Sequence, residues 1–304
     1  MYKKKIQKLY PVILFVYKRP SHTKKVIFNL KKNYLAKNTI LYVFSDGPKN
    51  ISEKKNVEKV RKIISNISGF KKVIIYKKNK NIGLKKSILT GVNKIIKKHK
   101  ALIVLEDDIL TAPYFLKYMN EALNFYKDKK KVWHISGWNV PLENKYYSKT
   151  FFYRSMNCWG WATWVDRWYQ YENDIRKIES LMDSEKKFHF NNNNTENFYW
   201  QLIANKKKYT STWAIFWYLT IFLNNGLCVN PYLSLTKNIG LDNSGSHGKK
   251  SFQIEKKLPL NKVSKFIFSN KIVENKKVYS QIVKYYKFKN FILFKGINKI
   301  LNFF

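Results

Sequence analysis

The feature that most restricts the fold of this chain is the alternation of short apolar segments with amphipathic helical patterns over its first third. The apolar segments are residues 11–17, 39–45, 72–76 and 101–105. The helical patterns between them are residues 21–32, 52–65 and 83–99. Such alternation is typical of parallel strands joined by right-handed helical crossovers. The sequence therefore predicts an α/β fold: a Rossmann-like, mostly parallel sheet with helices on both faces.

An acidic triplet, Glu106-Asp107-Asp108, directly follows the apolar segment 101–105. Ligands of open α/β sheets collect at the carboxyl ends of the strands. Three adjacent carboxylates favour a bound cation, and Mg²⁺ or Mn²⁺ held partly by a phosphate-bearing substrate is the usual arrangement. An acidic loop, or negative charge at the start of the helix expected after Pro113, explains the triplet equally well. On the triplet alone both interpretations stay open.

The other predicted strands also end in polar residues, at 18–22, 45–48 and 79–83, with Ser21 as the expected helix cap. Each segment by itself is ordinary turn chemistry. Together they place Arg19, Asp46 and Lys85 around one crevice with the triplet. Asp46 is then expected to hold a base or ribose, and Arg19, Lys85 and a metal a pyrophosphate.

Two common nucleotide-binding signatures are missing from the sequence. No glycine-rich dinucleotide motif follows the first apolar segment, and no Walker-type loop occurs. These absences argue against hydride transfer and against P-loop phosphoryl transfer.

The chain of 304 residues carries a formal net charge of +40, which first suggests nucleic acid or an anionic membrane as a partner. Nearly all of this charge is lysine, which lacks the bidentate fork with which arginine reads bases. The excess resembles a genome-wide codon bias. A basic nucleic-acid-binding protein remains an alternative, but it does not account for carboxylates at a strand end.

Cys158 and Cys228 have neither disulfide-framework nor metal-ligand spacing, so a reducing compartment is expected. The sequence shows no export signal and no apolar run long enough to span a bilayer. Its longest apolar stretch, residues 213–223, is predicted to be a buried core helix. A cytoplasmic protein is therefore expected, with peripheral attachment to the inner face of the membrane as a further expectation.

Three more segments follow the triplet, and their order along the chain is informative. They are residues 135–139 (Ile-Ser-Gly-Trp-Asn), residues 159–168 with four tryptophans, and residues 238–248, from Asn238 through Ser246-His247-Gly248. With Ser45-Asp46-Gly47 and Asn81-Ile82-Gly83, this order resembles the GT-A class of nucleotide-sugar-dependent glycosyltransferases over residues 10–250. It is most similar to the N-acetylglucosaminyltransferase I type and to bacterial surface-polysaccharide sugar transferases.

The resemblance implies a GT-A domain over residues 1–250, with a donor half at 1–130 and an acceptor half at 131–250. It implies Asp108 as the ligand of Mn²⁺ or Mg²⁺, and Glu106 and Asp107 as contacts of the donor's ribose or sugar. Asp46 would hold the nucleobase side. The loop of Ser244 to Gly248 would close over the diphosphate, with His247 touching phosphate or metal; a solvated surface histidine is the alternative.

Acceptor contacts are implied for Trp138, Asn139, Trp159 and Trp161, because aromatic rings suit the apolar faces of sugars. Ordinary core packing is the alternative for each tryptophan.

The expected catalytic base is missing, because Ala214 stands where the family has an aspartate after Trp213. Inverting transfer needs such a group to deprotonate the acceptor hydroxyl. Asp242 is the first substitute and Glu196 the second. Asp242 as a plain turn residue, or a chain without catalytic activity, stays open.

Residues 251–304 form a basic extension, and residues 285–304 within it are rich in aromatic and basic side chains. This end is expected to form an amphipathic helix that either lies on an anionic membrane or packs on the domain.

The expected activity is inverting transfer of a sugar from a nucleotide donor, a uridine diphosphate sugar, to a bacterial surface glycan such as lipopolysaccharide, capsule or a glycoprotein glycan. A metal-dependent nucleotidyltransferase or phosphotransferase is the second alternative, and its products would distinguish it.

Overall fold

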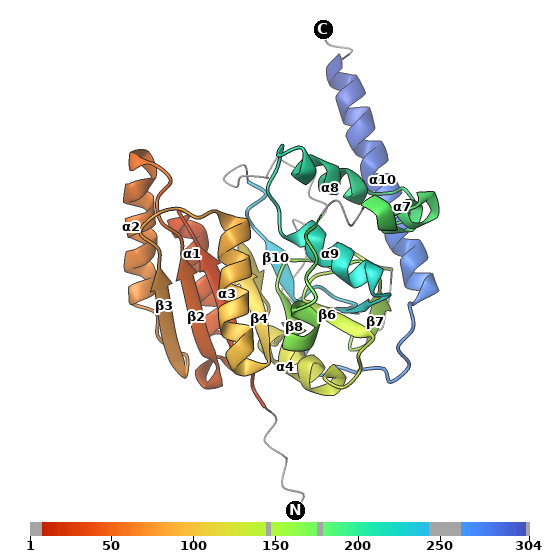
Figure 1. The fold of residues 1–304 in the computed structure, drawn as a ribbon. Helices are drawn as coiled ribbons and strands as arrows, with labels where there is room; N and C mark the ends of the chain where they lie inside the picture. Colours follow the sequence, from red (N-terminus) through yellow and green to blue (C-terminus); the bar gives the residue numbers. More distant parts are fainter. Residues whose placement is uncertain (1–7, 144–146, 175–178, 243–262, 302–304) are drawn as a thin grey trace, which may run out of the picture.

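The structure is a computed structural model that describes residues 8–143, 147–174, 179–242 and 263–301, and the side chains within these ranges up to Phe291. A central mixed sheet of eight strands, with helices packed on both of its faces, forms most of the described chain (Figure 1). The strand order in the sheet is β3-β2-β1-β4-β8-β6-β9-β7. The predicted α/β fold is thus observed.

The first four strands are parallel and match the predicted segments closely. They are β1 (Val12–Val16), β2 (Ile40–Ser45), β3 (Lys72–Lys77) and β4 (Ala101–Glu106). In β1, Val12 and Leu14 point to one hydrophobic cluster and Ile13 and Phe15 to another, on opposite faces of the sheet. Burial on both faces explains why this strand is continuously apolar.

The second half of the sheet mixes directions. Its strands are β6 (Val132–Ser136), β7 (Thr150–Tyr153), β8 (Trp161–Trp164) and β9 (Leu227–Pro231). Strand β8 runs antiparallel to both β4 and β6, β9 is parallel to β6, and β7 is antiparallel to β9.

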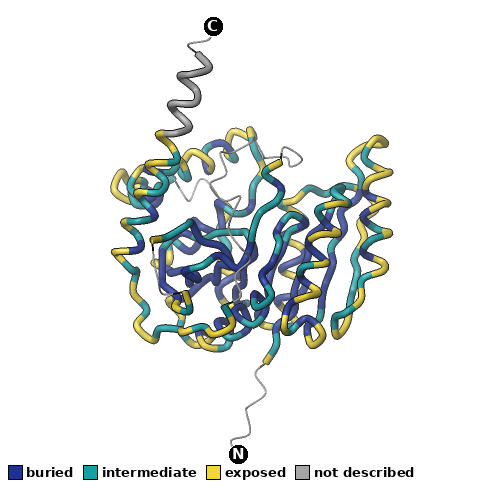
Figure 2. The backbone as a smooth tube through the Cα atoms, turned by 180° about the vertical axis from the view of Figure 1, so that it is seen from behind, coloured by how far each residue is buried: buried dark blue, intermediate teal, exposed yellow. Residues whose placement is uncertain are grey.

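Three helices connect the parallel strands: α1 (Pro20–Lys31), α2 (Ile51–Ser65) and α3 (Leu84–His99). The buried side chains of α1, α2 and α4 (Phe115–Tyr126) pack on one face of the sheet. The opposite face is covered by α3, the short helix α5 (Val165–Trp168) and α9 (Ala214–Leu223). Viewed from behind, the sheet is dark with buried residues (Figure 2).

Two details concern predictions about helices. The residue that caps α1 is Arg19 and not Ser21, because Pro20 occupies the first helical turn, where its fixed φ suits a helix. Helix α9 confirms the predicted core helix, since residues 215–221 are all buried. Among the described residues, no helix is long and apolar enough to cross a membrane.

A small second sheet joins two distant parts of the chain. Strand β5 (Ile109–Thr111) pairs antiparallel with β10 (Thr236–Asn238), with Ile109 opposite Asn238. Because β5 starts immediately after the acidic triplet, this pairing brings residues 238–242 to the triplet. A short 3₁₀ helix, η1 (Ala36–Asn38), and the helices α7 (Ser184–Phe190) and α8 (Phe198–Lys206) complete the body.

The described part of the C-terminal extension packs against α4 and against Arg154, which follows β7. Phe266 packs against Tyr118, with ring centroids 5.1 Å apart, and Glu274 forms an ion pair of 2.6 Å with Arg154. Helix α10 (Lys276–Leu301) begins there, buries Val278 and Ile282, and then extends away from the body (Figure 1). Its first turns are therefore part of the core.

Candidate active site at the end of strand β4

The acidic triplet lies at the carboxyl end of β4, where the parallel part of the sheet borders the antiparallel strand β8. Glu106 is the last residue of β4 and pairs with Phe15 of β1. Asp107 is buried, and the side chain of Asp108 is 15% exposed. Asp108 is therefore the carboxylate of the pair Asp107–Asp108 that solvent or a ligand reaches more easily.

Arg19 connects the end of β1 with the triplet. Its Nε donates to Asp107 Oδ1 at 3.0 Å, and its guanidinium forms ion pairs with Asp107 and, at 3.0 Å, with Asp108 Oδ2. The backbone amide of Tyr17 donates to Asp107 Oδ2 at 3.2 Å. Both oxygens of Asp107 are thus engaged. The predicted neighbourhood of Arg19 and the triplet is present in the structure.

The electrostatics of the triplet indicate too much negative charge for one arginine. Burial, followed by repulsion from Asp108 and Asp107, raises the pKa of Glu106 to about 8. Burial also raises the pKa of Asp107, although Arg19 opposes this effect. Further positive charge at this edge would favour the ionised carboxylates.

Gly240 lies directly against this ion pair. The backbone amide of Ile239 donates to the carbonyl of Asp108 at 2.9 Å. A Cβ at position 240 would collide with Asp108 Oδ2 and would lie 2.8 Å from a terminal nitrogen of Arg19. Only glycine lets the backbone approach so closely here.

His22 joins Asp242 to the same group. Its Nε2 lies 3.1 Å from Asp242 Oδ2 and 3.2 Å from the carbonyl of Ile239. His22 was not among the predicted site residues. The available signal was its position three residues after Arg19, which places both at the start of α1 on neighbouring positions of one face.

Asp46 acts as a junction between two loops. Its carboxylate accepts hydrogen bonds from the backbone amides of Gly47 at 2.9 Å, Ile82 at 3.0 Å and Gly83 at 3.0 Å. Asn81 Nδ2 in turn donates a hydrogen bond to the carbonyl of Gly47 at 3.0 Å. The motifs at the ends of β2 and β3 are therefore one structural unit, and a nucleobase at Asp46 would have to share its oxygens with these amides.

Lys85 and Glu196 contact other parts of the molecule. The ammonium of Lys85 lies 4.3 Å from the ring centroid of Phe216, and burial lowers its pKa. Burial raises the pKa of Glu196 to about 6, which nearby Lys289 of α10 opposes. Within the described part of the chain, no contact joins Glu196 to the triplet, whereas His22 holds Asp242 beside it.

The predicted acceptor residues separate into two groups. Trp138 and Trp159 pack edge to face, with centroids 4.7 Å apart, and Trp159 is partly exposed. Trp161 has no exposed surface: it stacks on Trp213 at 5.1 Å in the aromatic core. Trp161 is buried because its strand, β8, lies between β4 and β6. A sugar cannot reach it in this conformation, so the interpretation of Trp161 as a core residue holds.

Two further residues complete the picture of this region. Asn139 is buried, its backbone amide donates to the hydroxyl of Ser234, and that hydroxyl donates to the carbonyl of Asn139. The side-chain Nδ2 of Asn139 has no partner among the described residues.

Burial and the negative charges of Glu106 and Asp108 raise the pKa of the Cys158 thiol, which places Cys158 near the triplet. Sequence reasoning did not connect Cys158 with the site. Ser244 and His247 lie outside the described residues.

The residues at this edge fit a divalent cation that shares its ligands with a substrate. The described chain contains no group of three or more histidine, cysteine or acidic side chains arranged to hold a metal unaided. Mg²⁺ and Mn²⁺ sites built from one or two carboxylates, phosphate oxygens and water need no such group. Asp108, partly exposed and beside an excess of negative charge, suits that kind of site.

Comparison of the sequence with protein-family models found no match, and comparison with curated protein sequences found none either. Among solved structures, the chain is similar to S. aureus TarS, with 16% identity and a TM-score of 0.32, covering 47% of this chain and 25% of TarS. It is also similar to the mannosyltransferase PcManGT from Pyrobaculum calidifontis, solved in complex with GDP-Man and Mn²⁺. That match has 9% identity and a TM-score of 0.39 and covers 73% of each chain. The chain spans about a quarter of the length of TarS.

Proposed function

We propose that this chain is a metal-dependent glycosyltransferase that moves a sugar from a nucleotide-diphosphate donor to a glycan acceptor. The observation that carries the proposal is the grouping of Glu106, Asp107 and Asp108 at one strand end against a single arginine, with the Gly240 backbone pressed against them. This arrangement has an anionic surplus and a partly exposed carboxylate, which together suit a cation and the phosphates that accompany it.

In the proposed roles, Asp108 is the metal ligand and Arg19 and Lys85 face the donor phosphates. When bound, the cation would neutralise charge that develops on the departing diphosphate. Glu106 and Asp107 contact the ribose or the sugar. Asp46 holds the two loops that border the nucleobase, and Ser244 and His247 complete the donor side.

For the acceptor side, we propose Asp242 as the group that removes the acceptor's proton, since it is the candidate base that lies beside the triplet. His22 would orient its carboxylate. Trp138, Asn139 and Trp159 are the proposed acceptor contacts. Inversion of configuration, uridine diphosphate as the nucleotide and a bacterial surface glycan as acceptor are finer parts of the same proposal, as is action at the inner face of a membrane.

The test is donor turnover. Purified protein is incubated with a panel of nucleotide sugars, with Mn²⁺, with Mg²⁺ or with a chelator, and free nucleoside diphosphate is measured. Release of diphosphate that needs the cation supports the proposal. Asp108→Ala should lower it at least a hundredfold, as expected when a charge-stabilising group is lost. Asp128→Ala, a change of an exposed aspartate elsewhere, is the matched control.

Turnover that survives chelation or the Asp108→Ala change would refute the proposed role of Asp108. Release of pyrophosphate in place of a nucleoside diphosphate would indicate a nucleotidyltransferase.

A further inference from the structure

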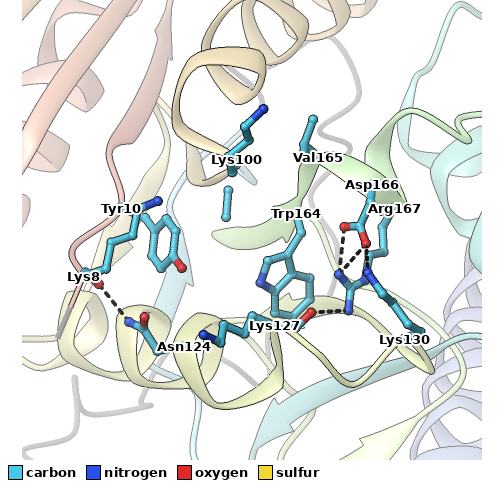
Figure 3. Close-up of a pocket in the computed structure, with 11 residues that line it drawn as sticks. Lys8, Tyr10, Lys100, Asn124, Lys127, Lys130, Trp164, Val165, Asp166 and Arg167 are labelled. Carbon is cyan, nitrogen blue, oxygen red and sulfur yellow. Dashed lines mark hydrogen bonds and ion pairs between the residues drawn. The ribbon is translucent and has the colours of Figure 1, made fainter.

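A cavity lies at the end of the sheet opposite the triplet. Its volume is about 340 Å³ (Figure 3). Its lining includes Tyr10, just before β1, and Ala101, the first residue of β4. Because β1 and β4 are parallel and the triplet follows their carboxyl ends, this cavity is at the other end of the strands.

The rim of the cavity is basic. Its lining contains one carboxylate and five basic residues, which are Lys8, Lys100, Lys127, Lys130 and Arg167. The carboxylate, Asp166, is already neutralised by ion pairs with Lys130 and, at 2.7 Å, with Arg167. Among the described residues, Lys8 and Lys100 form no ion pair, and Lys127 has only an exposed contact of 3.8 Å with Asp128. Three ammonium groups therefore remain for an anionic ligand.

The backbone around the cavity is fixed by buried contacts. Arg167 is buried, and it donates to the carbonyls of Lys127 at 2.9 Å and Val132 at 3.2 Å, so it closes the end of α4. Lys100 ends α3 with a φ of +69°, a conformation unusual for a residue other than glycine, and its carbonyl accepts from Val165. Lys100 and Lys127 thus extend from helix ends that these bonds hold in place.

The floor of the cavity is formed by the nearly buried rings of Tyr10 and Trp164 (Figure 3). The ammonium of Lys8 lies 5.4 Å from the centre of the Tyr10 ring, and the Arg167 guanidinium lies 4.5 Å from that of Trp164. Because these rings are only 5% and 4% exposed, a flat nucleobase has little ring surface on which to stack. A small ligand with C–H groups and one anionic group suits this floor and rim, and the volume is at the lower end for ligand pockets.

We propose that this pocket binds a sugar that carries a phosphate or carboxylate group. The anion lies among Lys8, Lys100 and Lys127, and C–H groups of the sugar contact the small exposed parts of Tyr10 and Trp164 that line the pocket. This site is independent of the function proposed for the triplet, since the two lie at opposite ends of the sheet.

The experiment is calorimetric titration of the full chain at 150 mM salt, a concentration that screens non-specific attraction. The probes are glucose 1-phosphate, glucuronate, glucose, inorganic phosphate and uridine monophosphate. We expect one or both anionic sugars to bind, at least tenfold more tightly than glucose or inorganic phosphate. The two anionic sugars differ in the acid group and in the carbon that carries it, C1 for the phosphate and C6 for the carboxylate, so the ratio of their affinities shows which of these two arrangements the pocket prefers.

The variant K100E/K127E should weaken this binding at least tenfold, and K8E alone should weaken it less. The variant K54E/K55E on α2 makes the same change of net charge at exposed positions and should leave binding intact. Asp108→Ala should leave it intact too, so that a failed donor test and a failed pocket test remain distinct. Thermal unfolding of each variant checks its fold.

The proposal would be overturned if neither glucose 1-phosphate nor glucuronate bound, or if inorganic phosphate bound as tightly as glucose 1-phosphate. It would also be overturned if uridine monophosphate bound more tightly than glucose 1-phosphate and glucuronate. An equal loss in K54E/K55E would also overturn it, because general charge attraction would then explain the binding.

Discussion

Arg19 pairs with two carboxylates that the proposed metal must also approach. Its guanidinium is 3.0 Å from Asp108 Oδ2, the oxygen next to Gly240. In the absence of a donor, this arginine is therefore a competitor for any divalent cation at Asp108. A donor diphosphate would draw the guanidinium toward its own oxygens and leave the carboxylate to the metal.

We predict that Arg19→Ala binds Mn²⁺ more tightly than the parent protein when no donor is present. Removing the guanidinium frees Asp108 Oδ2 and leaves the triplet with more uncompensated negative charge. Tenfold tighter binding would add about 1.4 kcal/mol of Mn²⁺-dependent stability, measured as the shift in thermal unfolding on adding the ion. In the double variant Arg19→Ala/Asp108→Asn this gain should vanish. Equal Mn²⁺ shifts in the single variant and the parent would contradict the prediction.

At the scale of elements, the ends of β2 and β3 are joined by one side chain. Asp46 accepts from three backbone amides, and Gly47 has no space for a side chain because the backbone of Asn79 and Lys80 lies within 2.8 Å of where its Cβ would be. The two loops therefore keep their shape together or lose it together.

Asp46→Ala should cost about 2 kcal/mol of unfolding free energy, since it leaves buried amides without an acceptor. Asp46→Asn keeps one oxygen and should cost less. Urea denaturation measures both, and amide hydrogen exchange at Ile82 and Gly83 should speed up in the alanine variant. Unchanged exchange at these two amides would show that the loops do not depend on Asp46.

The outer turns of α10 are a second element with a testable property. Phe288 and Phe291 are more than half exposed (56% and 55%) on a helix that also carries Lys284, Lys287 and Lys289. Exposed aromatic and basic side chains on one helix favour an anionic bilayer surface.

We predict that the full chain floats with vesicles containing anionic lipid and that F288D/F291D floats at least several-fold less. Phe28 is similarly exposed, at 57%, on α1, so F28D is the matched control and should float like the parent. If F28D lost as much vesicle binding as F288D/F291D, any exposed phenylalanine would contribute equally to membrane binding, and α10 would have no special role in it.

For the whole molecule, His134 links stability to pH. It is fully buried in β6, accepts from Trp217 Nε1 at 3.1 Å through Nδ1, and burial lowers its pKa to about 3. Its value in the unfolded chain is about 6.5, so between these values the unfolded chain binds more protons. The contribution of neutral His134 to stability is therefore complete above pH 6.5 and is lost as the pH drops toward 3.

Urea unfolding at pH 7.5 and pH 5 should show His134 contributing a loss of about 2 kcal/mol at the lower pH. His134→Phe should be less stable at pH 7.5, since Trp217 loses its acceptor, but its stability should change less between the two pH values. His189→Phe, a change at a half-exposed histidine, should keep the parent's pH dependence. A parent-like pH dependence in His134→Phe would contradict this account.

The sequence predicts residues 11–105 well because most of the strands there are buried on both faces and the helices are amphipathic, which are local signals. The four predicted strands agree with β1 to β4 to within one residue at each end. Strands β7, β8 and β10 are only three or four residues long, too short for a periodic pattern, and their antiparallel pairing depends on distant partners.

The contrast between local sequence signals and contacts between distant segments also applies to the site. The meeting of Arg19 with the triplet follows from the rule that parallel strands end at one edge. The positions of Gly240, His22 and Cys158 depend on the pairing of β5 with β10 and on tertiary packing, which no local pattern encodes. The burial of Trp161 is also a property of the whole sheet, because it is set by the strands on both sides.

The pairing of β5 with β10 has a consequence for the order of events during synthesis. Asp108 leaves the ribosome early, together with strands β1 to β4, while Ile239 and Gly240 follow only after most of the chain has been made. A nascent chain stalled before this point would carry these four strands without the backbone that lies against Asp108. On the proposed function, nucleotide sugar should protect a chain stalled after Gly248 and its exit-tunnel spacer from proteolysis, but not one stalled after β9.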